Sequence, residues 1–189
     1  VPVIVPGAGA DQIDIYDATL SGSVGTVLSI LNLGVGGNVA NTLNWTGGLA
    51  VDPNAGLAYL TYDDPDAGDV DAIQALELPQ LTVQNNLVNL AAGSNPTAVV
   101  NVDPSAGRVF AYMAGLAAVQ AFDNDTLVNI GPNLAVAAAP TDLAICSTLN
   151  RGYLVLANGT VQAFNTTTNA NSGAAVATVG GVNGATTSP

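Results

Sequence analysis

The tetrapeptide VQAF occurs twice in this chain, at Val119–Phe122 and Val161–Phe164, and each copy runs directly into a polar stretch. The two copies lie inside a longer match between Asn95–Leu127 and Ala139–Asn169. Self-similarity of this kind is typical of folds assembled from repeated supersecondary units, each of which needs its neighbours to bury its apolar surface. This repeat constrains the fold more strongly than any other feature of the sequence.

The match extends to earlier parts of the chain. The phrase VDPxAG recurs in Gly47–Asp63, and the segment IDIYD at Ile13–Asp17 has the shape of the VQAF strand. We count four copies from this alignment. The positions that align are Pro96 with Pro140, Arg108 with Arg151, Asp52 with Asp103, and Tyr59 with Phe110 and Tyr153.

Each copy reads as four short strands, which in the best-matched copy are expected at 97–102, 108–113, 117–122 and 127–131. Period-2 alternation and β-branched residues indicate strands, and the DPxAG phrase between the first two is turn chemistry. Four antiparallel strands in about 45 residues, repeated, are typical of a β-propeller blade. We therefore predict an all-β, β-propeller-like single domain over 1–189. Its repeats are expected at about 1–38, 39–93, 94–138 and 139–189, with the first repeat lacking its first strand.

The phrasing P-x-x-(V/L)-x-V-D-P-x-A-G-R-(V/L)-(F/Y)…V-x-A-F-D resembles the YVTN/NHL-type β-propeller repeats of extracellular and cell-surface proteins. The similarity is best over Asn95–Asn169 and fair over Gly47–Leu90. It implies a propeller fold in which the motif residues are architectural and carry no common chemistry.

The repeats are out of phase with the ends of the chain. Val1–Pro6 reads as a second strand, and Gly180–Pro189 stops at a proline that matches Pro96 and Pro140. Three arrangements are open: a four-bladed ring with one short blade, a half-ring that dimerises, or a slice of a longer chain. A start at Val1 without Met is expected of a processed form or of such a slice. In each case an unpaired strand edge is a template for adding a strand from another chain.

Charge is scarce and one-sided. Only 8% of residues are charged, against about 25% in an ordinary soluble domain, and two Arg against fourteen acids give a net charge of −12. Such a surface repels phosphate backbones and anionic lipid, so neither nucleic acid nor a membrane surface is an expected partner. No apolar run reaches the ~18 residues of a membrane span. This composition is typical of secreted, cell-surface and filament-forming proteins.

The residue types needed for common catalytic sites are absent, since the chain has no His and no Lys. This excludes Ser–His–Asp and Cys–His sites, Schiff-base chemistry and the usual zinc sites. A carboxylate pair for glycoside hydrolysis stays open because Asp is plentiful, but Asp52 and Asp103 recur in a turn, which favours a structural role. The single cysteine, Cys146, is expected at an inward strand position and has no intrachain partner.

One acidic insert stands out. It places Asp64, Asp66, Asp69 and Asp71 on a short loop that contains Gly68. Alternating carboxylates around a glycine can wrap a Ca²⁺ ion, although the spacing does not match an EF-hand loop and no Glu closes it. A solvated acidic loop is the favoured interpretation, and a Ca²⁺ site is the alternative.

Two further sets of residues are candidates for sites. Asn44, Asn124, Asn158 and Asn165 begin N-x-S/T sequons, and three of these fall on expected turns where a glycan would project freely. Arg108 and Arg151, at the start of the second strand, are expected either to contact a local Asp or to pair with acids of a neighbouring repeat or subunit.

The leading functional hypothesis is therefore a non-enzymatic, extracellular structural protein. We expect a subunit of a self-assembling filament or surface layer, joined through unpaired strands and carrying glycans. The first alternative is a secreted carbohydrate- or protein-binding adhesion module, which exposed aromatic residues on one face would favour. The second is a Ca²⁺-dependent, hydrolase-like propeller, which would need several carboxylates converging on a central channel.

Overall fold

The computed structural model describes residues 2–6, 12–17, 22–29, 44–63, 71–78 and 82–177. Nearly every described element is a β-strand, and the strands pair antiparallel with their neighbours in the chain. The prediction of an all-β, antiparallel chain is confirmed.

The strands form four sheets whose strand order follows the chain. The first sheet contains β1 (Pro2–Pro6), β2 (Gln12–Asp17) and β3 (Gly22–Ser29). The second contains β4 (Asn44–Asp52), β5 (Leu57–Asp63), β6 (Ala72–Glu77) and β7 (Thr82–Asn89). The third contains β8 (Pro96–Asp103), β9 (Arg108–Met113), β10 (Ala118–Asp123) and β11 (Leu134–Ala135). The fourth contains β12 (Pro140–Cys146), β13 (Arg151–Leu156), β14 (Thr160–Asn165) and β15 (Ala170–Asn171), with β16 (Val176–Ala177) also pairing with β14.

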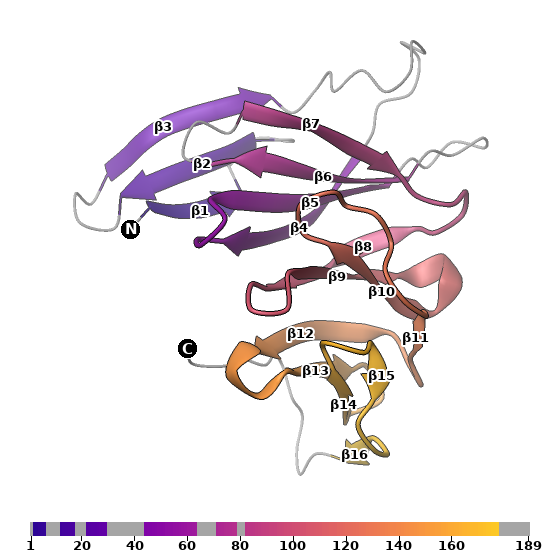
Figure 1. Ribbon diagram of the computed structural model, residues 1–189. Helices are drawn as coiled ribbons and strands as arrows, with labels where there is room; N and C mark the ends of the chain where they lie inside the picture. The colour runs from indigo at the N-terminus through magenta and orange to yellow at the C-terminus, as the bar shows by residue number, and fades with distance from the viewer. Residues whose placement is uncertain are drawn as a thin grey trace.

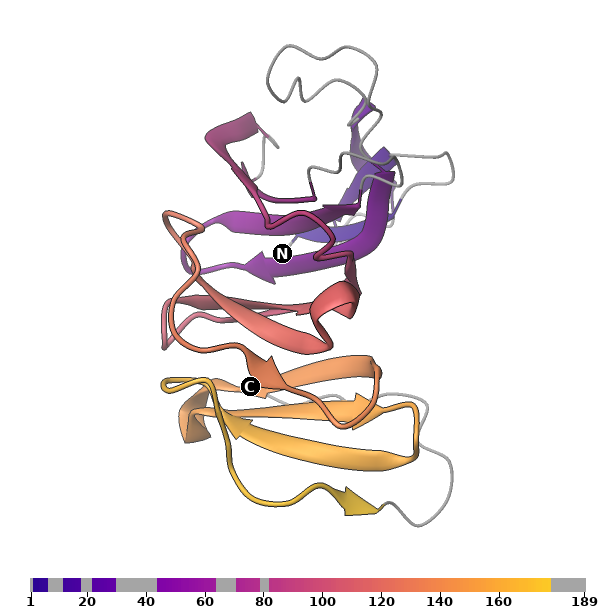
Figure 2. The same ribbon diagram turned by 90° about the vertical axis from the view of Figure 1, so that its right-hand side faces the viewer.

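The second, third and fourth sheets are stacked one on another. Strand β8 contacts both β4 and β12, so the first strands of the second, third and fourth sheets lie side by side. Figure 1 and the turned view in Figure 2 show the fourth sheet at one end of this stack and the first sheet, next to the second, at the other end.

The turn between the first and second strands depends on a residue in the left-handed region. Gly56 and Gly107 take φ values of 68° and 63°, as the DPxAG phrase predicts. In the fourth sheet the 3-10 turn η2 (Ser147–Leu149) replaces that phrase, and Asn150 takes the same position with φ 50°. Asn tolerates this region better than other residues with a side chain, so the repeat survives the loss of its glycine.

The predicted fourth strand at 127–131 is wrong in position. Only one isolated bridge, between Phe122 and Asn129, falls in this range, and regular pairing resumes at β11. The cause is the turn that follows β10, where Asp123 Oδ1 accepts the backbone N–H groups of Asp125 and Thr126 and Leu127 is held at φ 55°. After this turn the chain pairs with β10 only briefly, where the Asp123 N–H donates to the Val128 carbonyl oxygen and the Ile130 N–H donates to the Ala121 carbonyl oxygen, and no strand forms before β11.

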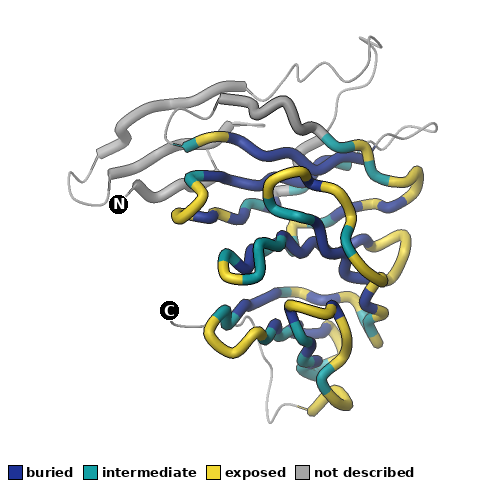
Figure 3. The backbone as a smooth tube through the Cα atoms, in the orientation of Figure 1, coloured by how far each residue is buried: buried dark blue, intermediate teal, exposed yellow. Residues whose placement is uncertain are grey.

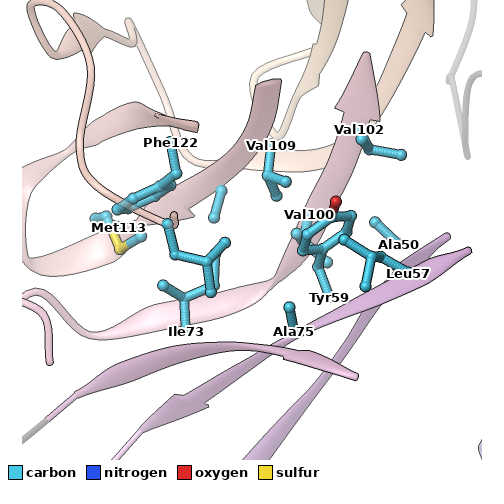
Figure 4. Packing of buried hydrophobic residues seen from close by; sticks show 12 residues of the cluster. Ala50, Leu57, Tyr59, Ile73, Ala75, Val100, Val102, Val109, Met113 and Phe122 are labelled. Atoms are coloured by element: carbon cyan, nitrogen blue, oxygen red, sulfur yellow. The ribbon is translucent and has the colours of Figure 1, made fainter. Parts of the chain in front are cut away.

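Two hydrophobic clusters fill the contacts between sheets. The first lies between the second and third sheets and includes Tyr59, Ile73 and Phe122, as Figure 4 shows. The second lies between the third and fourth sheets and includes Phe110 and Phe164. Figure 3 shows buried positions along the strands and exposed positions at the turns. The two described helices, η1 (Ala114–Leu116) and η2, are single turns, and no described helix meets the length and hydropathy of a membrane span.

Candidate functional site

The contacts between sheets repeat a single pattern of residues. In the third sheet, the face turned toward the fourth sheet carries five apolar side chains, which are Phe110, Tyr112, Val119, Ala121 and Leu134. All five are buried. The face of the second sheet turned toward the third carries residues at the same register positions, which are Tyr59, Thr61, Ile73, Ala75 and Val88.

The fourth sheet has a corresponding face, here called the outer face, on its side away from the third sheet. Strand register assigns its five positions to Tyr153, Val155, Val161, Ala163 and Val176. These positions are as apolar as those of the two buried faces. Within the described part of the chain, no sheet follows the fourth one.

Exposure separates the outer face from its two counterparts. Leu134 in the third sheet is 3% exposed, whereas Val176 at the equivalent position is 68% exposed. Tyr153, Val161 and Ala163 are half-buried, although the equivalent residues in the second and third sheets are fully buried. Val155, the remaining position, is 1% exposed and is as buried as its counterparts. The same strip of apolar side chains is thus covered by the next sheet in the second and third sheets, and is only partly covered in the fourth.

Polar groups link successive sheets at the end of the first strand. Asp52 Oδ1 accepts the N–H groups of Asn54 and Ala55, and its Oδ2 accepts a 3.3 Å hydrogen bond from Asn124 Nδ2 in the next sheet. Tyr59 adds a second link, since its hydroxyl donates to the Asn124 carbonyl oxygen at 2.9 Å. The second and third sheets are therefore tied by hydrogen bonds as well as by apolar packing.

Asp103 takes the equivalent position in the third sheet, where the Ser105 hydroxyl also reaches the Ser147 carbonyl oxygen of the following η2 turn at 3.2 Å. Its side chain accepts hydrogen bonds from the backbone of Ser105 and Ala106 and from the Ser105 hydroxyl. Burial opposes ionisation of this carboxyl, but the neighbouring hydroxyl groups of Thr166 in the fourth sheet, of Ser105 and of Ser147, together with the Ala106 N–H, favour its charged form and outweigh burial. Together they hold the pKa of Asp103 below its usual value. In the fourth sheet the equivalent position is occupied by Cys146, which brings no carboxylate to the outer face.

A buried glutamine recurs in the third strand of each sheet from the second onward, and the sequence reading missed its role. Gln162 Nε2 donates to the Ala135 carbonyl oxygen at 3.0 Å, which links β14 to the outermost strand of the preceding sheet. Gln120 and Gln74 occupy the same register position. The repeated Q of VQAF and IQAL was the available signal, because a polar residue kept at an inward strand position needs a buried partner.

The sequons differ in what their asparagines contact. Asn158 is exposed on the β13–β14 turn, and its Oδ1 accepts from the Thr160 hydroxyl at 2.7 Å and from the Thr160 N–H at 3.1 Å. Asn124 uses its amide nitrogen to bond Asp52, whereas Asn165 is half-buried and caps its own turn through Oδ1. Asn44 lies on β4, paired with Asp63. Glycosylation stays a prediction at all four, and the geometry favours Asn158.

The acidic insert lies mostly outside the described residues, which include Asp71 but not Asp64, Asp66 or Asp69. Asp71 is fully buried, and its Oδ2 accepts the backbone N–H of Asn95 at 2.7 Å. Asp71 thus joins the second sheet to the start of the third. Among the described residues, no group of three or more His, Cys, Asp or Glu is gathered around one point.

The two arginines start β9 and β13, as the repeat alignment predicts. Arg151 Nη1 donates to the Ser172 hydroxyl at 2.9 Å within the fourth sheet. Arg108 lies opposite Asp103 and Asp123 in the strand register. Ion pairs of either arginine with a neighbouring repeat or subunit stay a prediction.

No family model matches the chain, and no curated protein matches it. Among solved structures, hydrazine synthase from Kuenenia stuttgartiensis matches with a TM-score of 0.61 and 12% identity, over 88% of this chain and 43% of that chain. BamB from Moraxella catarrhalis matches with a TM-score of 0.54 and 14% identity, over 90% of this chain and 47% of that chain. This chain therefore spans less than half the length of either structure. Both are β-propeller proteins, and the likeness shows that this chain has a β-propeller-like fold.

Proposed function

We propose that this chain is a non-enzymatic, extracellular structural protein that assembles with copies of itself into a filament or surface layer. The observation that carries the proposal is the outer face of the fourth sheet. It repeats, position by position, two faces that are buried within the chain, yet it is only partly covered. Burying apolar surface is the main favourable contribution to protein association, so this face favours a contact with another sheet.

Within this proposal the four sheets are four propeller blades in an open array, and the first blade lacks its first strand. Each sheet lies inside one of the four predicted repeats. In Figure 1 the first sheet lies beside the second and away from the fourth, which favours an open array over a ring closed within one chain. The share of the longer propellers that this chain spans, 43% and 47%, also favours an incomplete ring.

The aromatic residues favour a structural role over an adhesion module. An adhesion module that holds carbohydrate would need aromatic rings exposed together on one face. Of the seven aromatic side chains whose burial is described, six are buried and Tyr153 is half-buried. Tyr153 lies on the outer face itself, where a second protein sheet would cover it.

Few charges and an exposed sequon favour an extracellular location. Only 8% of the residues are charged, so solubility outside the cell would depend on amides, hydroxyls and attached sugar. Asn158 is exposed on the turn between β13 and β14, where a glycan could be attached.

Electron microscopy of the native, unconcentrated protein tests the proposal. We expect regular fibres or sheets whose repeat is close to the length of one chain. Discrete particles, each the size of a single 18.7 kDa chain at all concentrations, would contradict it. The alternative of a soluble binding module would then be tested against glycans and Ca²⁺.

A further inference from the structure

We infer that the outer face of the fourth sheet binds the first sheet of a second copy of this chain, in the same face-to-face manner that joins the sheets within one copy. The inference rests on the proposed self-assembly and specifies which surfaces meet. It requires a partner sheet whose own face matches the faces already packed inside the chain.

Those packed faces have a shared pattern, seen where a sheet meets the sheet before it. In the third sheet, β9 and β10 place Val109 opposite Phe122 and Ala111 opposite Gln120. In the fourth sheet, the equivalent pairs are Gly152 with Phe164 and Leu154 with Gln162. Each such face combines small or aliphatic residues on the second strand with a polar residue and an aromatic residue on the third.

The first sheet has the same pattern. The register of β1 and β2 places Val3 opposite Tyr16 and Val5 opposite Asp14. On the second strand, Val3 and Val5 take the positions of Val109 and Ala111. On the third strand, Tyr16 takes the position of Phe122, and Asp14 takes the position at which the other sheets have a glutamine. The second sheet has the corresponding pairs Ala58 with Leu76 and Leu60 with Gln74, all of them buried. In the other three sheets, the face with this pattern is turned toward the preceding sheet. Within the described chain, no sheet precedes the first one.

An aromatic pair gives the match a specific position. Where the third and fourth sheets meet, Phe110 and Phe164 pack edge to face, with ring centroids 5.3 Å apart and planes at 64°. Tyr59 and Phe122 belong to the same cluster at the preceding contact. The equivalent residues at the contact between copies are Tyr153 of the fourth sheet and Tyr16 of the first. Edge-to-face aromatic pairs stabilise contacts beyond the area that they bury.

The edge of the outer face is suited to a contact between separate molecules. At the internal contacts, Asp52 accepts a hydrogen bond from Asn124 of the following sheet, and the Thr166 hydroxyl of the following sheet favours the charged form of Asp103. Cys146 stands at this position in the fourth sheet. The second copy therefore does not have to supply a donor to a carboxylate that the contact would otherwise bury unpaired.

Such a contact is heterologous, because it joins two different faces, so it either closes into a ring or continues as a polymer. Either outcome uses the same pair of faces. The contact can therefore be tested separately from the filament.

Photo-cross-linking tests the contact directly. Tyr153 is replaced by the photoreactive p-benzoylphenylalanine in the full chain, ¹⁴N- and ¹⁵N-labelled chains are mixed and irradiated, and the products are mapped by mass spectrometry. We expect cross-links from position 153 to residues 2–6 or 12–17 of a chain with the other isotope label. The same replacement at Val128, which is 58% exposed in the segment between β10 and β11, is the control and should give no such product. Adding Val176→Asp should lower the yield about tenfold or more, since it places a charge in the contact.

Three results would overturn the inference: cross-links to the fourth sheet of another copy, cross-links to the first sheet within one chain, or no cross-link at any concentration. Fibres whose cross-links map elsewhere would overturn the contact and leave the proposed function standing. Closed two-copy rings with the expected cross-link would support the contact and overturn the proposed filament or layer.

Discussion

The hydroxyl group of Tyr59 in the second sheet donates a 2.9 Å hydrogen bond to the backbone carbonyl oxygen of Asn124 in the third sheet, 65 residues along the chain. The Asn124 amide returns a bond to Asp52, close to the same tyrosine. The contacts of the third sheet with the second and with the fourth thus each combine an apolar strip with a polar link at the edge. This combination is the basis of the stability predictions that follow.

Replacing Tyr59 with Phe should lower the free energy of unfolding by about 1 kcal/mol, because the Asn124 carbonyl loses a donor. It should also change the alkaline behaviour. Burial, followed by the charges of Asp52, Asp125 and Asp123, raises the pKa of Tyr59 above its ordinary value of 10.0. A raised pKa contributes stability that is fully present below pH 10 and is lost as the pH rises beyond it. Urea titrations between pH 8 and 11 should show a smaller alkaline loss in Y59F, and equal losses in both proteins would contradict the assignment.

Replacing Asp103 with Asn should lower stability at pH 7 by about 1–2 kcal/mol, because hydrogen bonds to a charged group are stronger than those to a neutral amide. The pKa of Asp103 lies below the ordinary value of 3.8, so its contribution is present above pH 3.8 and is lost as the pH falls through the lower, folded-state value. Thermal melts from pH 7 to pH 2.5 should therefore be flatter for D103N. Asp125→Asn, at an exposed turn, is the control that removes the same charge. An equal loss of stability and an equally flattened pH dependence in D125N would show that Asp103 acts only through net charge.

Gly152 lies where an added methyl group would overlap the Phe164 ring. We expect Gly152→Ala to destabilise the chain by about 1–3 kcal/mol, the usual effect of overpacking a core. The ring cannot move freely, because it packs against Phe110. In a double-mutant cycle with Phe164→Leu, the effect of Gly152→Ala should shrink markedly. Additive effects in denaturant titrations would show that the ring is not the obstacle.

Self-assembly should depend on salt. Each chain has a net charge of −12, and the outer face contributes no charged side chain to offset repulsion between copies. The Debye length falls from about 30 Å at 0.01 M salt to about 8 Å at 0.15 M, so raising the ionic strength should promote association. Light scattering over a NaCl series at constant pH measures this. Association that weakens as salt rises would indicate a contact held by ion pairs instead, such as those considered for Arg108 and Arg151.

Strand positions could be predicted from the sequence where local pattern determines them. Alternation and the preceding turn placed a strand at 108–113, which is β9. The fourth strand was misplaced because the Asp123 side chain turns the backbone before pairing resumes. The bond between Asp52 and Asn124 joins residues 72 positions apart, and no local pattern reports such a partner.

The outer face was visible in the sequence without being recognised. Strand β13 reads RGYLVL, in which Tyr153 and Val155 alternate with Leu154 and Leu156, so apolar residues occupy both faces. A strand that is apolar on both faces indicates a sheet covered on both sides. Only the structure shows that one side of the fourth sheet packs against the third sheet while Val176 on the other side stays exposed.

Sedimentation velocity of the unmodified chain beside Val176→Asp tests the central claim most directly, with Val128→Asp as the matched control. Both valines are exposed, at 68% and 58%, so neither substitution should disturb the folded chain. The outer-face account predicts that the unmodified chain and V128D associate well beyond 18.7 kDa as concentration rises, while V176D stays at the mass of one chain. Equal association of all three proteins, or none in any of them, would contradict it.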